Sequence, residues 1–162
     1  MTRSNTIPLP SLERIKELFI YDDELKNFTN KVTRGRAKAG KISGYLDEYG
    51  YRWIRVDYTL YLAHRLIWLW HTGDDPGGLL VDHKDQDPTN NCFTNLRLAT
   101  DPQNQINANQ KGYCFHKEAG RWEAYIHIDQ VKHYLGLHDT EEEARAAYLT
   151  AARETFGEFC PT

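Results

Sequence analysis

The segment from residue 79 to residue 109 constrains this chain more than any other. The apolar run Leu79–Val81 predicts a short strand that leads into the pair Asp82-His83. A polar loop, KDQDPTNN, follows, and Leu96–Thr100 predicts a second short strand. Thr100 or Asp101 can cap a helix over about 102–109, with a proline near its first turn. The segment therefore predicts a strand, a loop, a second strand and a helix, with an Asp-His pair where the loop begins.

The polar side chains of this segment have the chemistry that phosphodiester hydrolysis requires. The reaction needs a base to activate water and a cation to neutralise charge that develops on the phosphate and the leaving oxygen. A neutral His, with an ordinary pKa of about 6.5, can act as the base. A carboxylate and an amide oxygen suit a hard ion such as magnesium or manganese. Asp82, His83, Asn95 and Asn104 supply these groups.

In residue type, spacing and predicted context together, DHKDQDPTNNCFTNLRLATDPQNQ resembles the HNH motif of the ββα-metal endonucleases. The preceding HRLIW and GYRWIRV segments are also similar to the phage and intron-encoded, homing-type branch of that family, so the resemblance covers roughly residues 40–110. It implies that His83 is the general base and that Asp82 and Asn104 ligate one divalent metal ion, magnesium or manganese. It also implies that Asn95 orients the His83 ring, through its backbone or its side chain. Asp85, Asp87, Asn90 and Asn91 are assigned to the turns of the loop itself.

The N-terminal region predicts a helix followed by a basic segment. Ser11 is a plausible N-cap for a helix over 11–19, whose apolar residues fall on one face. The segment KVTRGRAKAGK, residues 31–41, has five basic residues and no acidic one. It is either a solvated loop or a segment that contacts phosphate. The candidate DNA-contacting residues here are Lys31, Arg34, Arg36 and Lys38, and Arg97 in the second short strand is a further candidate.

The middle of the chain predicts strands and one buried helix. In the segment 51–56, Tyr51, Trp53 and Arg55 alternate with Arg52, Ile54 and Val56, and Asp57-Tyr58 predicts a turn into the next strand. The run 64–71 is apolar at helical spacing and is stopped by Gly73.

After residue 110 the pattern changes to three strands and a helix. The strands are predicted over 112–116, 121–128 and 132–137, and Thr140 with Glu143 forms a capping box for a helix that ends at Gly157. Period-two alternation assigns Trp122, Ala124, Ile126, Ile128, Tyr113, Phe115, His133, Leu135 and Leu137 to the face that packs on the helix. The other face carries aromatic, basic and hydrogen-bonding groups, which suits either a solvated sheet or a sheet that lies on a DNA groove.

The segments KGYCFHKEAGRWEAYIHI, HYLGLHDTEEEARAAY and FGEF together resemble the plant ethylene-response-factor (APETALA-type) DNA-binding domain, over roughly residues 110–160. That resemblance implies a three-stranded sheet that enters the major groove. The positions that match its DNA contacts are Lys111, Cys114, His116, Tyr125, His127, Lys132 and Tyr134, and Arg121 is a further candidate on the same face. Several positions that carry Arg in the plant domains are Cys or His here, so no base preference is carried over.

These patterns predict an α+β protein, in which a ββα-metal HNH nuclease motif is followed by a three-stranded antiparallel sheet packed on one helix. We expect three regions: an N-terminal helix and basic DNA-contacting segment over 1–40, a nuclease domain over 41–110 and a DNA-binding domain over 111–162. The expected partner is double-stranded DNA, with a divalent metal ion, no small-molecule cofactor, no membrane and a monomeric state favoured. The net charge of −3 does not itself favour DNA binding. Attraction to DNA therefore has to come from basic residues gathered on one face of the protein.

The remaining features bear on location and on rival functions. No apolar run approaches the roughly 18 residues of a membrane span, and the N-terminus has no signal-peptide pattern, so we expect a cytoplasmic protein, encoded by a phage and acting in its bacterial host. Three widely spaced cysteines predict neither a disulfide framework nor a metal site. The rival functions are a non-catalytic DNA-binding regulator, an RNA-processing nuclease and a structural or protein-interaction domain.

Overall fold

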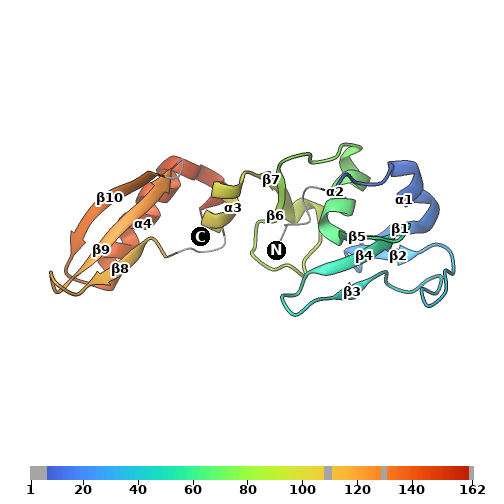
Figure 1. Ribbon diagram of the computed structural model, residues 1–162, viewed down its shortest axis with the longest axis horizontal. Helices are drawn as coiled ribbons and strands as arrows, with labels where there is room; N and C mark the ends of the chain where they lie inside the picture. Colours follow the sequence, from blue (N-terminus) through green and yellow to red (C-terminus); the bar gives the residue numbers. More distant parts are fainter. Residues whose placement is uncertain (1–6, 108–110, 129–130, 161–162) are drawn as a thin grey trace. The chain divides into compact units, whose positions relative to one another are not determined.

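A computed structural model describes residues 7–107, 111–128 and 131–160. The chain divides into two compact units, residues 1–99 and residues 100–162, and each is described by itself (Figure 1). Within the described ranges, no helix has the length and apolar character needed to cross a membrane.

From residue 7 onward, the first unit contains two α-helices and three small antiparallel sheets. Its elements are α1 (Leu12–Leu18), β1 (Phe19–Asp22), β2 (Asn27–Asn30), β3 (Tyr45–Leu46), β4 (Arg52–Val56), β5 (Thr59–Leu62), α2 (Ala63–Thr72), β6 (Leu80–His83), the 3-10 turn η2 (Phe93–Asn95) and β7 (Leu96–Ala99). The strands pair as β1–β2, as β3–β4–β5 and as β6–β7. Each sheet is too small to be stable alone, so the unit depends on the core that the sheets share with the helices.

Local signals in the sequence explain where these elements begin and end. The hydroxyl of Ser11 accepts a hydrogen bond from the Arg14 amide at 3.2 Å and caps α1 as predicted. Gly73 ends α2 in the left-handed conformation, with φ of 82°. Asp57 and Tyr58 both have positive φ, which is the geometry of a type I′ hairpin turn between β4 and β5.

One apolar core joins both helices of the first unit to β1, β2, β4, β6 and β7. It contains Ile15, Leu18, Phe19, Phe28, Ile54, Val56, Ala63, Leu66, Ile67, Leu69, Val81 and Leu96. Helix α2 is buried around most of its circumference, since His64 and Arg65 are buried together with its apolar residues. The core therefore places α2 directly behind β6, the strand that carries the Asp-His pair.

The second unit is a three-stranded sheet with a long helix on one face (Figure 1). Its elements are α3 (Asp101–Asn107), β8 (Tyr113–His116), β9 (Arg121–Ile128), β10 (Val131–His138), α4 (Glu141–Phe156) and the 3-10 turn η3 (Gly157–Phe159). The strand order is β10-β9-β8, all antiparallel. Small buried residues of α4, Ala144 and Ala152, let the helix approach the sheet closely. The predicted α+β class and the sheet-on-helix arrangement are confirmed.

A β-bulge changes which side chains of β10 face the helix. The register with β9 shifts between Tyr134 and Gly136, so that Leu137 pairs with Glu123 and His138 pairs with Trp122. Residues directly opposite in an antiparallel pair share a face, so Leu137 lies on the outer face with Glu123. The alternation that placed Leu137 against the helix is wrong because the extra residue of the bulge reverses the period.

Candidate active site

Strands β6 and β7 form a short hairpin that carries both members of the Asp-His pair. Asp82 lies opposite Arg97, and His83 lies opposite Leu96. Both polar side chains are buried, with 6% of Asp82 and 5% of His83 exposed. Buried polar groups are retained in a fold when specific partners satisfy them. The partners of Asp82 and His83 therefore define the site.

The imidazole of His83 lies in a pocket of polar and aromatic side chains. Its Nε2 is 3.1 Å from Oδ1 of Asn91. The ring of His64, from α2, packs edge-to-face against it with a centroid distance of 5.0 Å, and Tyr51 lies 6.2 Å away. Burial, together with the nearby His83 and Arg65, lowers the pKa of His64 well below its ordinary value. His64 is therefore a neutral ring beside His83.

Asn91 is a buried amide with contacts on both ends. It is 1% exposed, and its Nδ2 donates to Oδ1 of Asn27 at 3.4 Å and to the carbonyl of Thr89 at 3.5 Å. These acceptors orient the amide so that its oxygen points at His83. A chain of hydrogen bonds thus connects β2 to the imidazole through Asn91.

Asn95 holds the loop between β6 and β7 together. Its Nδ2 donates to Oδ1 of Asp85 at 2.8 Å and to the carbonyl of Asn90 at 2.9 Å, and its own carbonyl accepts from the amide of Lys84 at 2.9 Å. Burial raises the pKa of Asp85, but hydrogen bonds from Asn90, from the amide of Asp87 and from Asn95 outweigh it and lower that pKa below its usual value. These contacts hold the loop in one conformation.

Arg97 forms an ion pair within the β6–β7 hairpin. Its Nε donates to Oδ2 of Asp82 at 2.8 Å, and both side chains are buried. A buried carboxylate is tolerated in a fold when a charged hydrogen-bond partner of this kind satisfies it.

Among the described residues there is no group of three or more His, Cys, Asp and Glu side chains that could hold a metal ion.

Asn104 lies on α3, at the start of the second unit. Its backbone amide donates to the carbonyl of Thr100 at 3.0 Å, in the first turn of the helix. The side chain of Gln103 accepts from the Thr100 amide at 2.8 Å and thereby caps this helix.

The basic side chains of the segment 31–41 lie in two different environments. Lys31 donates to the carbonyl of Lys16 at 3.2 Å, and the guanidinium of Arg34 packs 4.9 Å above the ring of Phe19. Arg36 and Lys38 instead line a pocket of about 550 Å³ on the outer side of the β3–β4–β5 sheet. The pocket also contains Lys41 and Arg55 from outside the predicted set.

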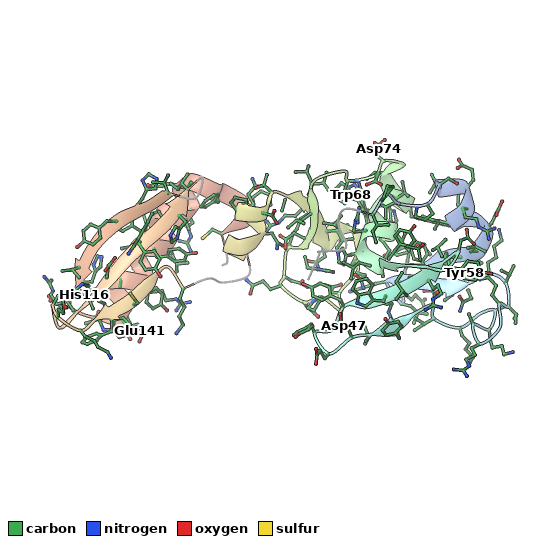
Figure 2. All side chains as sticks on the ribbon, in the orientation of Figure 1. Asp47, Tyr58, Trp68, Asp74, His116 and Glu141 are labelled. Atoms are coloured by element: carbon green, nitrogen blue, oxygen red, sulfur yellow. The ribbon has the colours of Figure 1, made fainter. Side chains whose placement is uncertain are left out.

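The outer face of the C-terminal sheet brings most of its predicted residues together. On it Lys132 is 2.5 Å from a carboxylate oxygen of Glu123 and 4.3 Å from the ring centre of Tyr125. Tyr134 lies opposite Tyr125, and His127 packs edge-to-face against it. The other predicted residues are at the margins: His116 accepts from the Ala119 amide, Arg121 pairs with Asp139 at 2.9 Å, and the Lys111 ammonium lies 5.9 Å from the Tyr113 ring (Figure 2 labels His116).

Two features of the site were not predicted from the sequence. The sequence predicts only a turn role for Asn91, because in the pair Asn90-Asn91 nothing distinguishes a turn residue from a buried one. Lys41 belongs to the basic segment but is not among the predicted DNA contacts, and the sequence predicts for Arg55 only a place in an alternating strand. The alternation itself was the available signal, since it puts Arg55 on the face away from the core.

The segment that carries this site is similar to known proteins. A family model described as HNH endonuclease matches residues 61–106, the stretch that runs from β5 to α3. The chain is 36% identical over 124 residues to a protein named "Uncharacterized HNH endonuclease L560" of Acanthamoeba polyphaga mimivirus, an alignment that covers 74% of this chain and 65% of that protein.

A second relative is covered over most of its length. Protein 3.8 of Escherichia phage T7 is 30% identical over 104 residues, which is 59% of this chain and 85% of that protein. No solved structure matches the chain. The family model spans the β6–loop–β7–α3 segment, and the relatives extend well beyond it. The chain belongs to the HNH endonuclease family.

Proposed function

We propose that this protein is a metal-dependent endonuclease, of the homing-like type found in phages, that hydrolyses phosphodiester bonds in double-stranded DNA. The observation that carries the proposal is the buried pair Asp82 and His83 on β6, each fixed by a specific partner. Family membership supports the reaction class, and Asp82 and His83 are the residues to which we assign the chemistry.

His83 is the proposed general base. Asn91 presents its amide oxygen to Nε2, because its nitrogen already donates to Asn27 and Thr89. Nε2 then carries the hydrogen, and the lone pair that can accept a proton is on Nδ1. Water gives its proton to Nδ1 as its oxygen bonds to phosphorus, and the bond from phosphorus to the leaving oxygen breaks. Asn95 supports the base indirectly by holding the loop that contains Asn91.

Asp82 and Asn104 are the proposed ligands of a divalent metal ion, magnesium or manganese. The donor chemistry fits, since magnesium is usually held by one or two protein oxygens with water and substrate phosphate as further ligands. Arg97 holds the buried carboxylate of Asp82 in a fixed orientation through its 2.8 Å contact with Oδ2. When bound, such an ion neutralises charge on the phosphate and on the leaving oxygen.

The second unit is the proposed duplex-binding module. Its outer face combines Lys132, Tyr125, His127 and Tyr134 on a sheet whose other side is covered by α4. Aromatic and hydrogen-bonding side chains on a rigid sheet suit contacts to base edges and phosphates. The resemblance to the APETALA-type domain adds support for the major groove as the target.

A plasmid cleavage assay tests the proposal. Supercoiled plasmid is incubated with the protein in magnesium, in manganese or in EDTA, and the wild type is compared with His83→Ala. We expect metal-dependent nicking or linearisation that His83→Ala slows by roughly 10²–10⁴-fold with little change in DNA affinity. Equal loss of binding and cleavage would remove His83 as the base.

The same experiment separates the rival functions. Tight binding to duplex without cleavage in any metal would instead indicate a DNA-binding regulator. Preferential cleavage of RNA in a competition with duplex DNA would indicate an RNA-processing nuclease.

A further inference from the structure

A basic pocket lies in the first unit between the segment 36–42 and the outer face of the β3–β4–β5 sheet. Four cations line it and none of its lining residues is acidic; the cations are Arg36, Lys38, Lys41 and Arg55. Its volume of about 550 Å³ is within the usual range for small-ligand sites. None of the residues proposed for catalysis lines it.

The floor of the pocket is apolar and aromatic. Successive residues of a strand face opposite sides, so the burial of Ile54 and Val56 in the core puts Trp53 and Arg55 on the outer face. Tyr45 lies directly opposite Trp53, and both line the pocket. The indole of Trp53 is held in place by a hydrogen bond of 2.9 Å to Asp47, labelled in Figure 2, in the turn between β3 and β4. Tyr45 is 53% exposed, so its ring remains accessible.

The basic wall of the pocket is held in a defined shape. The side-chain nitrogen of Asn30 donates to the carbonyls of Lys38 at 3.3 Å and Lys41 at 3.0 Å. Arg34 and Ala37 form a tight reciprocal backbone pair, and the Ala39 amide donates to the hydroxyl of Thr33. A wall fixed in this way loses little conformational entropy when it binds a ligand.

We infer that this pocket binds one nucleotide of an unpaired DNA strand, with its base against Tyr45 and Trp53 and its flanking phosphates against Lys38, Lys41, Arg36 and Arg55. A phosphate alone would need the cations but not the aromatic floor. Proteins that hold single strands combine a positive groove with aromatic rings on which bases stack. In a paired duplex the faces of the bases are covered by their neighbours, and contacts to its backbone need no aromatic surface. The inference rests on the proposed function in taking DNA as the polymer.

Two pairs of matched variants test the inference in the full-length protein. Tyr45→Ala removes the ring from the pocket, and Tyr58→Ala removes an equally large ring from the β4–β5 turn, where Tyr58 is 96% exposed (Figure 2). Lys38→Gln removes a charge from the pocket, and Lys16→Gln removes the same charge from α1, outside the pocket. Affinity is measured in EDTA by fluorescence anisotropy, with a labelled single-stranded 12-mer and with the matching duplex.

We expect Tyr45→Ala to weaken single-strand binding by about tenfold or more, with a smaller effect on duplex. Lys38→Gln should weaken it as well and should reduce the salt slope by about 0.7. Photocrosslinking of an oligonucleotide that contains 5-iododeoxyuridine should label Tyr45 or Trp53, as mapped by mass spectrometry. The controls Tyr58→Ala and Lys16→Gln should bind the single strand like the wild type.

The inference is overturned if Tyr45→Ala matches Tyr58→Ala on the single strand, if Lys38→Gln matches Lys16→Gln, or if all crosslinks lie outside the pocket. A larger loss on duplex than on the single strand would also overturn it, in favour of a duplex-backbone contact. Because the assay runs in EDTA without cleavage, its result is independent of the plasmid assay. Failure of the nuclease proposal and failure of the pocket can therefore be told apart.

Discussion

At the scale of single residues, Asn91 determines which nitrogen of His83 can accept a proton in the proposed mechanism. Replacing it with Leu, which has a similar volume, removes the acceptor for Nε2–H and leaves the imidazole to choose either tautomer. We expect kcat to fall by roughly 10–100-fold, with KM for DNA nearly unchanged, because the residue positions the base and does not contact the substrate. Steady-state cleavage of a defined duplex measures both parameters.

Asn90→Ala is the matched control for this prediction. Asn90 is the adjacent residue of the same type, and its side chain donates to Asp85 at 2.6 Å rather than to the imidazole. If damage to the loop alone accounted for the loss, Asn90→Ala and Asn91→Leu would reduce kcat equally. That result would withdraw Asn91 as a positioning residue.

His64 makes the stability of the first unit depend on pH. In the folded protein its pKa is depressed by burial, whereas in the unfolded chain it titrates near its ordinary value of about 6.5. Between the two values the unfolded state binds the extra proton, so the free energy of unfolding falls as pH drops below about 6.5. Urea denaturation from pH 8 to pH 5 should show this decrease.

His64→Phe keeps a ring in the same place but cannot bind a proton. We expect its free energy of unfolding to change less steeply with pH than that of the wild type over the same interval. Identical slopes for the two proteins would mean that His64 is protonated in the folded state, contrary to its burial beside His83 and Arg65.

At the scale of elements, the packing of α4 depends on the absence of a side chain at Gly112. A Cβ there would overlap the ring of Tyr148 on α4 and the carbonyl of Tyr125 on β9. We expect Gly112→Ala to destabilise the second unit by roughly 1–3 kcal/mol, because neither neighbour can move without disturbing the sheet or the helix. Amide hydrogen exchange over residues 113–156 measures the effect in that unit alone.

Gly78→Ala provides the comparison for this element. A Cβ at Gly78 meets nothing within 4 Å, and the residue does not have positive φ. Its exchange rates and melting curve should match those of the wild type. Wild-type protection in Gly112→Ala would show that α4 is packed less closely on the sheet than its small residues indicate.

The elements also show how far the sequence could predict the fold. Helix ends and hairpins followed from local chemistry: Ser11 and Thr140 cap their helices, and Gly73 ends α2. The face of Leu137 could not be predicted, because a bulge adds one residue without any change in the apolar pattern. Alternation is therefore reliable only as far as the first irregularity in the strand.

The candidate site was predictable in part for a related reason. Asp82 and His83 follow an apolar strand, where the chemistry of the residues and the local pattern agree. The sequence does not show which of Asn91 and Asn95 contacts His83. The distance between Asn91 and His83 is set by tertiary packing against Asn27, which no local pattern predicts. The structure gives the positions of these residues within each unit, and their catalytic and metal-binding roles stay predictions.

At the scale of the whole molecule, charge is distributed unevenly. Residues 1–99 contain fourteen Lys and Arg and thirteen Asp and Glu, whereas residues 100–162 contain six and ten. The second unit is therefore acidic overall, although a DNA-binding face is proposed for it. Three of its acidic residues, Glu141–Glu143, are in the first turn of α4, where they favour the positive end of the helix dipole. Most duplex affinity in that unit has to come from local contacts on the sheet and not from net charge.

Glu123 is an acidic residue on the proposed DNA-binding face, so its substitution tests whether local contacts on that face determine duplex affinity. Its carboxylate pairs with Lys132 in the middle of that face and would lie near the phosphates of a bound duplex. Glu123→Gln should tighten duplex binding by about fivefold at low salt, since one close repulsion is removed and Lys132 becomes available to phosphate. Glu142→Gln makes the same change in net charge on α4 and controls for long-range effects. Fluorescence anisotropy in EDTA, over a range of salt concentrations, measures both variants. If the two tighten binding equally, net charge alone explains the gain and the outer face of the sheet does not contact DNA.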